Sequence, residues 1–346
     1  MRYVWQKPEY TLGQVDKAGQ ILIDESASVD EKEEALDIIN NWRASHDFPL
    51  QTFRNTLRKY SSKTQSTPLP LVAQRIKRLK SIENKLKGFP TMRLCEMQDI
   101  GGCRVVLEGV ERVFELKNIY EKSRIKHDLI RTKDYINEPK SSGYRGLHLI
   151  YRYKSERKPE YNHLQIEIQI RTRLQHLWAT AVETVDTLTR NALKSSIGAH
   201  EWLRFFSIMG SVIAREEGTP LVPGTPSVEV ELLDELRSLS DSLGVEKKLT
   251  AYSLVPSMEK ETRWKEVRYY LLELDRGKAT IKITGFSQAD LDQATRMYVE
   301  MEKKPSDKGN ETVLVSVDKL RDLRKAYPNY YADTREFLDI LRMALK

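Results

Sequence analysis

Strict alternation of polar and apolar residues over residues 165–172 constrains the fold of this chain more than any other feature. Isoleucine stands at positions 166, 168 and 170, and every residue between them is polar or charged. A period of two predicts a half-buried β-strand with one polar face. This face carries Gln165, Glu167, Gln169 and Arg171. A strand that points a carboxylate, two amides and a guanidinium in one direction is either a solvated edge or one wall of a site.

Composition places the chain among water-soluble globular proteins. It has 346 residues, of which 40% are hydrophobic and 31% are charged, and this length suggests about two domains. No apolar run approaches the roughly 20 residues that cross a bilayer. Residues 1–7 lack the apolar core of a signal peptide. We therefore expect a cytoplasmic protein without a membrane partner.

Cysteine usage excludes two classes of small stabilised domain. Cys95 and Cys103 are the only cysteines, and neither cysteine nor histidine follows His200. A disulfide framework is not indicated, and the last third of the chain cannot form a Cys/His zinc finger.

Positive charge is concentrated in one part of the chain. The formal net charge is +7, and Glu83 is the only acidic residue between Arg54 and Arg93. Since a solvated surface usually mixes both signs, this imbalance favours a phosphate-bearing ligand, with a plain basic surface as the alternative. Nucleic acids and nucleotides are the partners that such charge permits.

A basic helix is predicted from about Val72 to Lys87. Lys77, Ser81 and Lys85 are spaced by four and would share one face of it. Two ammonium groups and a hydroxyl in one row suit a polyphosphate.

Asp99 precedes Gly101 and Gly102 at the mouth of a predicted buried strand, Cys103–Leu107. A carboxylate there, facing Glu167 on a neighbouring strand, would make an all-oxygen site for Mg²⁺. On its own, Asp-Ile-Gly-Gly is also an ordinary turn.

Residues 133–148 form a predicted loop, the tyrosine loop, which combines turn-forming residues, several cations and a tyrosine between glycines. Gly143 and Gly146 allow the backbone to approach a ligand, and Tyr144 could stack on a base. The alternative is a long hairpin loop with an exposed tyrosine. His148 begins a predicted strand, Leu147–Tyr153, and is either a site residue or a hydrogen-bonded strand-end histidine.

Later elements follow from the same periodicities. Helix 173–191 is expected to hold Glu183 and Asp186 in solvent. From about residue 265 the pattern becomes strand, strand, helix, strand and two helices, which predicts a separate module. We expect two domains, residues 1–262 and 263–346. The ranges expected after residue 191 are 202–214, 228–243, 267–274, 279–284, 287–301, 312–317, 318–326 and 334–345.

Four motifs in fixed order resemble the synthetase domain of the RelA/SpoT family. They are Arg75-x-Lys77-x-x-x-Ser81-x-x-x-Lys85, Asp99-x-x-Gly102-x-Arg104, Lys133-Asp134-Tyr135 through Gly143-Tyr144-x-x-Leu147-His148, and Glu167-x-Gln169-Ile170-Arg171-Thr172. The resemblance implies an α/β (α+β), nucleotidyltransferase-like fold with a mixed sheet flanked by helices. It also implies an enzyme that moves the β,γ-pyrophosphate of ATP to a ribose 3′-hydroxyl and releases AMP.

On the ATP side, the resemblance implies that Arg75 and Arg104 enclose the adenine. Lys77, Ser81 and Lys85 would then bind the phosphates.

On the acceptor side, Asp99 and Glu167 would bind Mg²⁺, and Glu167 would also take the proton of the attacking hydroxyl. Tyr144 would stack on the acceptor base, and Lys133 and His148 would contact phosphates.

The C-terminal part resembles a ββαβ pseudo-zinc-finger module that carries a Tyr-x-x-Tyr motif, Tyr327 and Tyr330. A synthetase domain fused to such a module resembles the CapRel group of toxin–antitoxin proteins among the toxic small alarmone synthetases. This implies transfer to the 3′ CCA end of tRNA, inhibition by the module through Tyr327 and Tyr330, and release by a phage capsid or other phage protein. Simple packing of both tyrosines against the final helix is the alternative.

Two further functions remain open from the sequence. In the tyrosine loop, Arg145 and Gly146 stand where alarmone synthetases usually have glutamine and serine, and the segment 176–179 also departs from their pattern, so the acceptor is not fixed. The chain could instead synthesise the alarmones (p)ppGpp or (p)ppApp. It could also be a non-enzymatic RNA-binding regulator, although intact Lys77, Lys85 and Asp99 argue against this.

Overall fold

The computed structural model describes residues 5–64, 70–189, 199–253, 267–275, 280–303, 311–316 and 334–346. Tyr327 and Tyr330, and the helix expected over 318–326, lie outside these residues. None of the described helices is both long and apolar enough to cross a membrane.

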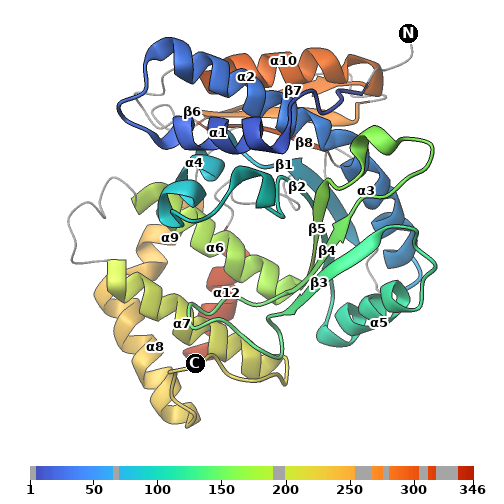
Figure 1. Ribbon diagram of the computed structural model, residues 1–346. Helices are drawn as coiled ribbons and strands as arrows, with labels where there is room; N and C mark the ends of the chain where they lie inside the picture. The colour runs from blue at the N-terminus through green and yellow to red at the C-terminus, as the bar shows by residue number, and fades with distance from the viewer. Residues whose placement is uncertain are drawn as a thin grey trace.

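One eight-stranded mixed sheet organises the described part of the chain (Figure 1), in the order β3-β4-β5-β2-β1-β8-β6-β7. Only β2 and β5 pair in parallel, whereas every other neighbouring pair is antiparallel. The expected mixed sheet flanked by helices is thereby confirmed. The strands are β1 Leu71–Ile76, β2 Gly101–Leu107, β3 Asp128–Asp134, β4 Leu147–Arg152, β5 Gln165–Thr172, β6 Tyr269–Asp275, β7 Thr280–Phe286 and β8 Glu311–Ser316.

The strand predicted from alternation is β5, with the predicted bounds. Its three isoleucines are fully buried in the hydrophobic core that the sheet shares with the N-terminal helices. Glu167 and Arg171 on the other face are also buried, so this face is not a solvated edge. It is covered by protein and forms the wall of a pocket.

N-terminal helices build the core on one face of the sheet. Helix α3 packs on β1 and β2, and α5 packs on β2 and β5. In β2, alternate residues from Gly101 to Leu107 are buried toward this core, and Cys103 donates a hydrogen bond from Sγ to the carbonyl oxygen of Leu50 in α3 (3.7 Å). The helices of this half are α1 Leu12–Ile23, α2 Val29–Ser45, α3 Asp47–Ser61, α4 Leu79–Gly88 and α5 Val110–Glu121.

The basic helix expected over 72–87 is wrong in its first half. Residues 71–76 form β1, which pairs with β2 on one side and with β8 on the other. Helix α4 begins only at Leu79. Val72 and Ala73 are buried between the neighbouring strands, and this pairing with distant segments outweighs the local helical spacing. Lys77 therefore lies at the turn before α4 and not on a helical face with Lys85.

A second cluster of helices lies below the sheet in Figure 1 and forms its own core. Its members are α6 Arg173–Thr189, α7 Ala199–Glu216, α8 Glu229–Leu243, α9 Val245–Ser253 and α12 Arg335–Ala344. Helix α12 packs against α6 and α9. Its buried Phe337 lies 6.4 and 6.2 Å, between ring centroids, from Phe205 and Phe206 of α7.

The remaining C-terminal elements continue the same sheet. Strands β6 and β7, helix α10 Leu291–Lys303 and strand β8 follow in the expected ββαβ order. Strand β8 pairs with β1 at Gln74 and Arg75. The division at residue 262 and the pseudo-zinc-finger character stay predictions. No group of three or more His, Cys, Asp or Glu side chains suited to a metal occurs among the described residues.

Candidate functional site

A pocket opens over the central strands where β1, β2 and β5 meet. Its lining includes Arg75, Lys77, Asp99, Arg104, Glu167 and Gln169. Arg75, Gly102 and Glu167 are paired across three neighbouring strands, so they share one face of the sheet. Because Gly102 has no side chain, the floor between the arginine and the carboxylate stays open.

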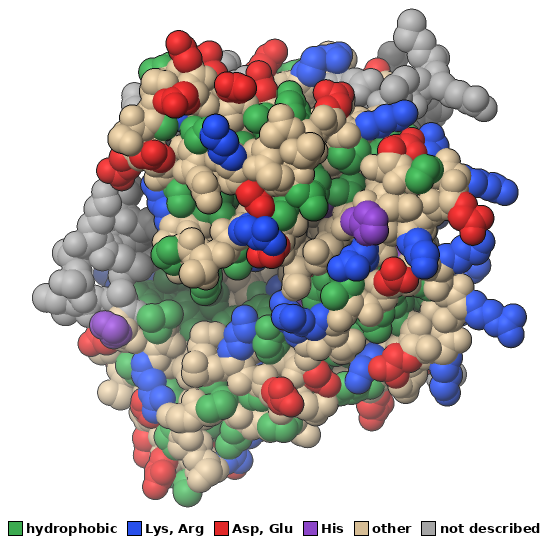
Figure 2. Space-filling view, in the orientation of Figure 1, with side chains coloured by type: hydrophobic (Ala, Val, Ile, Leu, Met, Phe, Trp, Pro, Cys, Tyr) green, Lys and Arg blue, Asp and Glu red, His purple; other side chains and the backbone are tan. Residues whose placement is uncertain are grey.

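The two sides of this pocket come from segments that the sequence singled out separately. Lys77 directly follows the end of β1, and Asp99 lies just before the start of β2. Glu167 lies on β5. Figure 2 shows a hollow between the upper and lower parts of the molecule, with Lys and Arg side chains on both sides of it. The arrangement thus gathers cations and carboxylates in one concave region.

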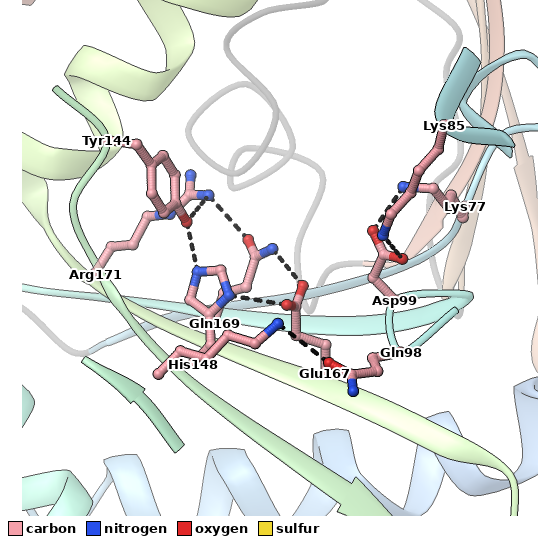
Figure 3. Close-up of polar contacts among 10 residues, drawn as sticks. Lys77, Lys85, Gln98, Asp99, Tyr144, His148, Glu167, Gln169 and Arg171 are labelled. Carbon is pink, nitrogen blue, oxygen red and sulfur yellow. Dashed lines mark hydrogen bonds and ion pairs between the residues drawn. The ribbon is translucent and has the colours of Figure 1, made fainter. Parts of the chain in front are cut away.

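Asp99 is held by two lysines (Figure 3). Lys77 Nζ lies 2.6 Å from Oδ2 and Lys85 Nζ lies 2.9 Å from Oδ1. Burial alone would raise the pKa of Asp99, but the two ammonium groups lower it well below its usual range. Burial lowers the pKa of Lys77, and Asp99 opposes this shift. Ser81 lies one turn before Lys85 on α4 and is half-buried.

Glu167 belongs to a ring of hydrogen bonds. His148 Nδ1 lies 2.8 Å from Glu167 Oε1, and Gln169 Nε2 donates to Glu167 Oε2 at 2.7 Å. Tyr144 Oη lies 2.5 Å from His148 Nε2. Arg171 Nη2 closes the ring by donating to Tyr144 Oη at 2.9 Å and to Gln169 Oε1 at 3.1 Å. Figure 3 shows these side chains pointing toward one another from β4, β5 and the tyrosine loop.

The ionised state of Glu167 assigns the direction of its hydrogen bond with His148. Burial would raise the pKa of Glu167, but the hydrogen bond and charge of His148 outweigh it, and the pKa is lowered. The ionised carboxylate can only accept, so His148 Nδ1 donates to it. His148 Nε2 lies against the Tyr144 hydroxyl, whose oxygen accepts from Arg171. Glu167 is therefore an ionised, oriented base at the pocket wall.

Tyr144 is engaged before any ligand binds. Besides its hydroxyl contacts, its ring has Arg171 Cζ at 5.2 Å and Lys140 Nζ at 5.4 Å from the centroid. Burial raises the pKa of its phenol. A stacked base would have to share or displace one of these cations, and base stacking by Tyr144 stays a prediction.

Lys133 also reaches the site. Its Nζ donates to Gln98 Oε1 at 3.1 Å, next to Asp99 in the chain. Burial lowers its pKa, and the charge of Glu167 opposes the shift. The residues predicted for the acceptor, Lys133, Tyr144 and His148, are thus brought to the Glu167 side of the pocket, whereas the lysines predicted for ATP lie on the Asp99 side.

Glu183 was expected in solvent, and this is wrong. The residue is half-buried on α6, which packs over the pocket face of β2 and β5. Burial would raise the pKa of Glu183, but the charges of Arg75, Arg104 and Arg171 lower it. Asp186 is exposed, as expected. Helical spacing alone could not predict that Glu183 is half-buried and Asp186 exposed, because the packing of α6 against the sheet is a tertiary feature.

Two further residues received no role from the sequence. Arg171 is buried, and its Nε and Nη1 have no hydrogen-bond partner among the described residues. Arg145 is buried on the other side of the tyrosine loop. The alternation of β5 placed Arg171 on the polar face without giving it a role, whereas nothing local indicates where Arg145 points.

Known proteins resemble the part of the chain that holds the pocket. "GTP pyrophosphokinase YjbM" of Bacillus subtilis (strain 168) is 33% identical over 123 residues, which are 35% of this chain and 58% of that protein. "GTP pyrophosphokinase YwaC" of the same organism is 34% identical over 121 residues, 33% of this chain and 56% of that protein. The chain thus spans little more than half the length of these curated relatives.

Among solved structures, that of small alarmone synthetase 2 from Bacillus subtilis aligns with a TM-score of 0.43 and 20% identity, covering 60% of this chain and 97% of the other. Residues 74–185 match the family RelA_SpoT, described as "Region found in RelA / SpoT proteins". The pocket, with Lys77, Asp99, Glu167 and the tyrosine loop, therefore lies in a region similar to RelA/SpoT proteins.

Proposed function

We propose that this chain is an ATP-dependent pyrophosphokinase. The observation that carries the proposal is Glu167: an ionised carboxylate, 7% exposed, oriented by His148 and facing a pocket that also holds Lys77 and Asp99. A buried, ionised carboxylate held in one orientation can accept the proton of a hydroxyl group. Lys77 and Lys85, gathered at Asp99, suit a polyphosphate donor because their charge would neutralise that of the phosphates.

The proposed reaction transfers the β,γ-pyrophosphate of ATP to a ribose 3′-hydroxyl. The 3′-oxygen forms a bond to the β-phosphorus, and the bond from that phosphorus to the oxygen bridging it to the α-phosphate breaks. AMP leaves with that oxygen, and the 3′-hydroxyl proton passes to Glu167. Such a transfer depends on positioning and charge stabilisation more than on covalent catalysis.

On the donor side, Lys77, Ser81 and Lys85 would bind the phosphates of ATP, and Arg75 and Arg104 would enclose its adenine. On the acceptor side, Lys133, Tyr144 and His148 would bind the nucleotide. His148 also orients Glu167 through Nδ1. These roles follow from the resemblance, and the grouping of the side chains around one pocket supports them.

Asp99 and Glu167 fit a Mg²⁺ ion by their chemistry. Both are ionised and line one pocket, and both oxygens of Asp99 already hold cationic groups. Mg²⁺ prefers oxygen ligands and usually completes its shell with water and substrate phosphates, so two carboxylates suffice. When bound, the ion would neutralise charge on the transferred phosphates.

The 3′ CCA end of tRNA is our first choice of acceptor. It is supported by the positive charge of the chain and by its resemblance to toxic small alarmone synthetases. Transfer to that end would block aminoacylation and translation. The alternative is a free nucleotide, which would give (p)ppGpp or (p)ppApp, and the names of the two Bacillus relatives support it. The lysine-bound Asp99 and oriented Glu167 disfavour a non-enzymatic RNA-binding regulator.

We also propose that the C-terminal module restrains the enzyme, with a phage capsid or other phage protein as the releasing partner. Physical contact between the module and the site supports restraint. Val315 of β8 pairs with Arg75, and Glu302 Oε1 accepts a hydrogen bond from the backbone nitrogen of Leu79 at the start of α4 (3.1 Å). The part assigned to Tyr327 and Tyr330 in this restraint stays a prediction from the resemblance.

Product analysis tests the proposal. The full chain would be incubated with ATP labelled in the γ-phosphate and with deacylated tRNA, GDP or AMP, in the presence of Mg²⁺. Label on tRNA supports the first acceptor, and label on a free nucleotide replaces it by the alternative. Glu167→Gln, which keeps the shape but not the charge, should reduce transfer by about 10²–10⁴-fold. Label on no acceptor, both with the full chain and with variants of β8 and α10 that weaken the contact between the module and the site, would refute the enzyme.

A further inference from the structure

Arg145 is next to Tyr144 in the chain, but its side chain lies away from the pocket. It is 2% exposed. Its Nη1 donates to the carbonyl oxygen of Pro220 at 2.8 Å, and its Nη2 donates to the carbonyl oxygen of Ile136 at 3.0 Å and to Thr219 Oγ1. One guanidinium thus joins the start of the tyrosine loop to the segment that follows α7.

The buried charge of Arg145 is balanced by acids at both ends of this contact. Burial lowers the pKa of Arg145, and the charges of Glu217 and Asp134 oppose the shift. Glu217 accepts from Thr172 Oγ1 and, at 2.8 Å, from Gln175 Nε2. Thr172 is the last residue of β5, the strand that carries Glu167. The contact therefore connects three segments around the site.

The same loop is fixed on α7 at a second place. Gly143 has φ +91°, and a Cβ added there would lie 2.6 Å from the carbonyl oxygen of Phe206. A Cβ on Gly210 would lie 2.8 Å from the Cα of Gly143. Ser207 Oγ donates to the carbonyl oxygen of Ser141 at 3.0 Å. The loop and α7 are too close for a side chain at either glycine, so this packing fixes the position of the loop on the helix.

The position of the loop on α7 determines where the Tyr144 hydroxyl lies. Between Arg145 and the β4 strand stands Gly146, with φ +148°, and an added Cβ would lie 3.3 Å from Arg171 Cγ and 3.5 Å from Tyr144 Oη. Small displacements of this backbone would therefore separate Tyr144 from His148 and Arg171. A preformed loop also binds its ligand without the entropic cost of ordering.

We propose that Arg145 is a positioning residue that holds the tyrosine loop in its acceptor-binding form, so that acceptor affinity depends on it although it touches no acceptor. This inference rests on the proposed function, because the acceptor is a ligand of the proposed reaction. ATP, on the Lys77 and Lys85 side, should be insensitive to Arg145.

Variants of the full chain separate this role from general stability. Arg145→Lys keeps the charge but loses the forked donors, and Thr219→Val removes one acceptor with little change of shape. Thr225→Val is the matched control. It lies in the same connection between α7 and α8 and loses comparable hydrogen bonds, to Ser211 and to the carbonyl oxygen of Val222, without contacting Arg145.

Hydrogen–deuterium exchange reads the loop without any need for activity. Backbone amides of Tyr135, Glu138, Lys140 and Gly143 are hydrogen-bonded within the loop. Both test variants should accelerate exchange in peptides covering 135–146 and leave peptides from β1 and α4 unchanged, whereas Thr225→Val should leave both unchanged. Unchanged exchange in 135–146 in both test variants would overturn the inference, whether or not the chain transfers pyrophosphate.

Binding then tests the consequence. GDP and deacylated tRNA serve as acceptor probes, and α,β-methylene ATP serves as the donor probe. Arg145→Lys should weaken whichever acceptor the wild type binds by about tenfold or more, with donor affinity within about twofold. Equal losses on both sides would overturn the positioning role. If the wild type bound neither acceptor, the acceptor role would fall as well. If it bound an acceptor but neither the wild type nor the β8 and α10 variants formed labelled product, the proposed function alone would fail.

Discussion

Neutralising Glu302 in α10 should destabilise the chain far more than its place near the C-terminus suggests. Its Oε2 lies 2.7 Å from Arg43 Nη1, and the two side chains are 12% and 3% exposed. Tyr298 Oη donates to Oε1 at 2.8 Å and accepts from Arg43 Nη2 at 2.8 Å. Burial alone would lower the pKa of Arg43, but Tyr298 and Glu302 raise it. The pair therefore depends on both partners.

The magnitude follows from what each variant leaves behind. Removing one partner of a buried ion pair costs about 3–5 kcal/mol, because the other charge stays buried without compensation. Glu302→Gln keeps an oxygen for Leu79 and Tyr298, so we expect about 3 kcal/mol. Arg43→Met also loses the hydrogen bond from Nε to the carbonyl oxygen of Lys77 (3.0 Å), so we expect about 4–5 kcal/mol. The double variant should lose less than the sum by about 2 kcal/mol.

Denaturant unfolding of the wild type, the two single variants and the double variant measures this coupling. The pair Arg173–Glu336 is the matched control, since it also joins a late helix to an earlier one but is 54% and 53% exposed at 2.7 Å. Its coupling should be below about 1 kcal/mol. Equal coupling energies in the two cycles would refute the reasoning. Because Arg43 holds the backbone of Lys77, the buried-pair variants should also weaken binding of α,β-methylene ATP.

Three other outcomes follow from the structure. Asp99 and Glu167 have lowered pKa values, so both stay ionised as pH falls, and initial rates should be flat from pH 8 down to about pH 5; a decline centred near pH 7 would contradict this. EDTA should abolish transfer and added Mg²⁺ restore it, and full activity in EDTA would exclude the metal. Burial lowers the pKa of His46 to about 4, so the unfolded chain binds more protons at this residue between about pH 6.5 and 4, and the contribution of His46 to stability falls as the pH falls through that window. His46→Gln should remove this contribution in urea titrations, and an unchanged pH dependence in the variant would count against it.

Local periodicity was sufficient to predict β5, the strand that faces a core on one side and a site on the other. The isoleucines of β5 and the polar row opposite them are visible in the sequence, and the structure uses both faces as the pattern indicates. The loop with Gly143 and Gly146 was flagged for close backbone approach. That approach is real, but for Gly143 it is toward α7 rather than toward a ligand.

Periodicity failed where long-range pairing decides the conformation. A helix was expected over 72–87 because Lys77, Ser81 and Lys85 have helical spacing, but residues 71–76 pair with β2 and β8 as a strand. Even so, Lys77 and Lys85 meet at Asp99. Convergence on a carboxylate therefore does not require one helical face, because a strand end and the following helix can present both lysines. The direction of Arg145 and the burial of Glu183 depend on α7 and α6 in the same way.

The last helix limits how the C-terminal module can be separated from the site. Phe337 of α12 is fully buried in the core of α6, α7 and α9, whereas α10 and β6 share a different cluster with Tyr269 and Tyr298. A truncation at residue 262 would therefore remove α12 together with the rest of the module. Helix α6, which carries Glu183 and Trp178, would then lose the helix that packs against it. Phe337→Ala should destabilise the chain by about 3–5 kcal/mol, and Met343→Ala on the same helix, 73% exposed, by less than about 0.5 kcal/mol. If thermal melts gave equal small shifts for both, α12 would be dispensable and truncation would be a clean test of restraint. With the expected difference, restraint has to be tested by substitutions in β8 and α10 that leave α12 in place.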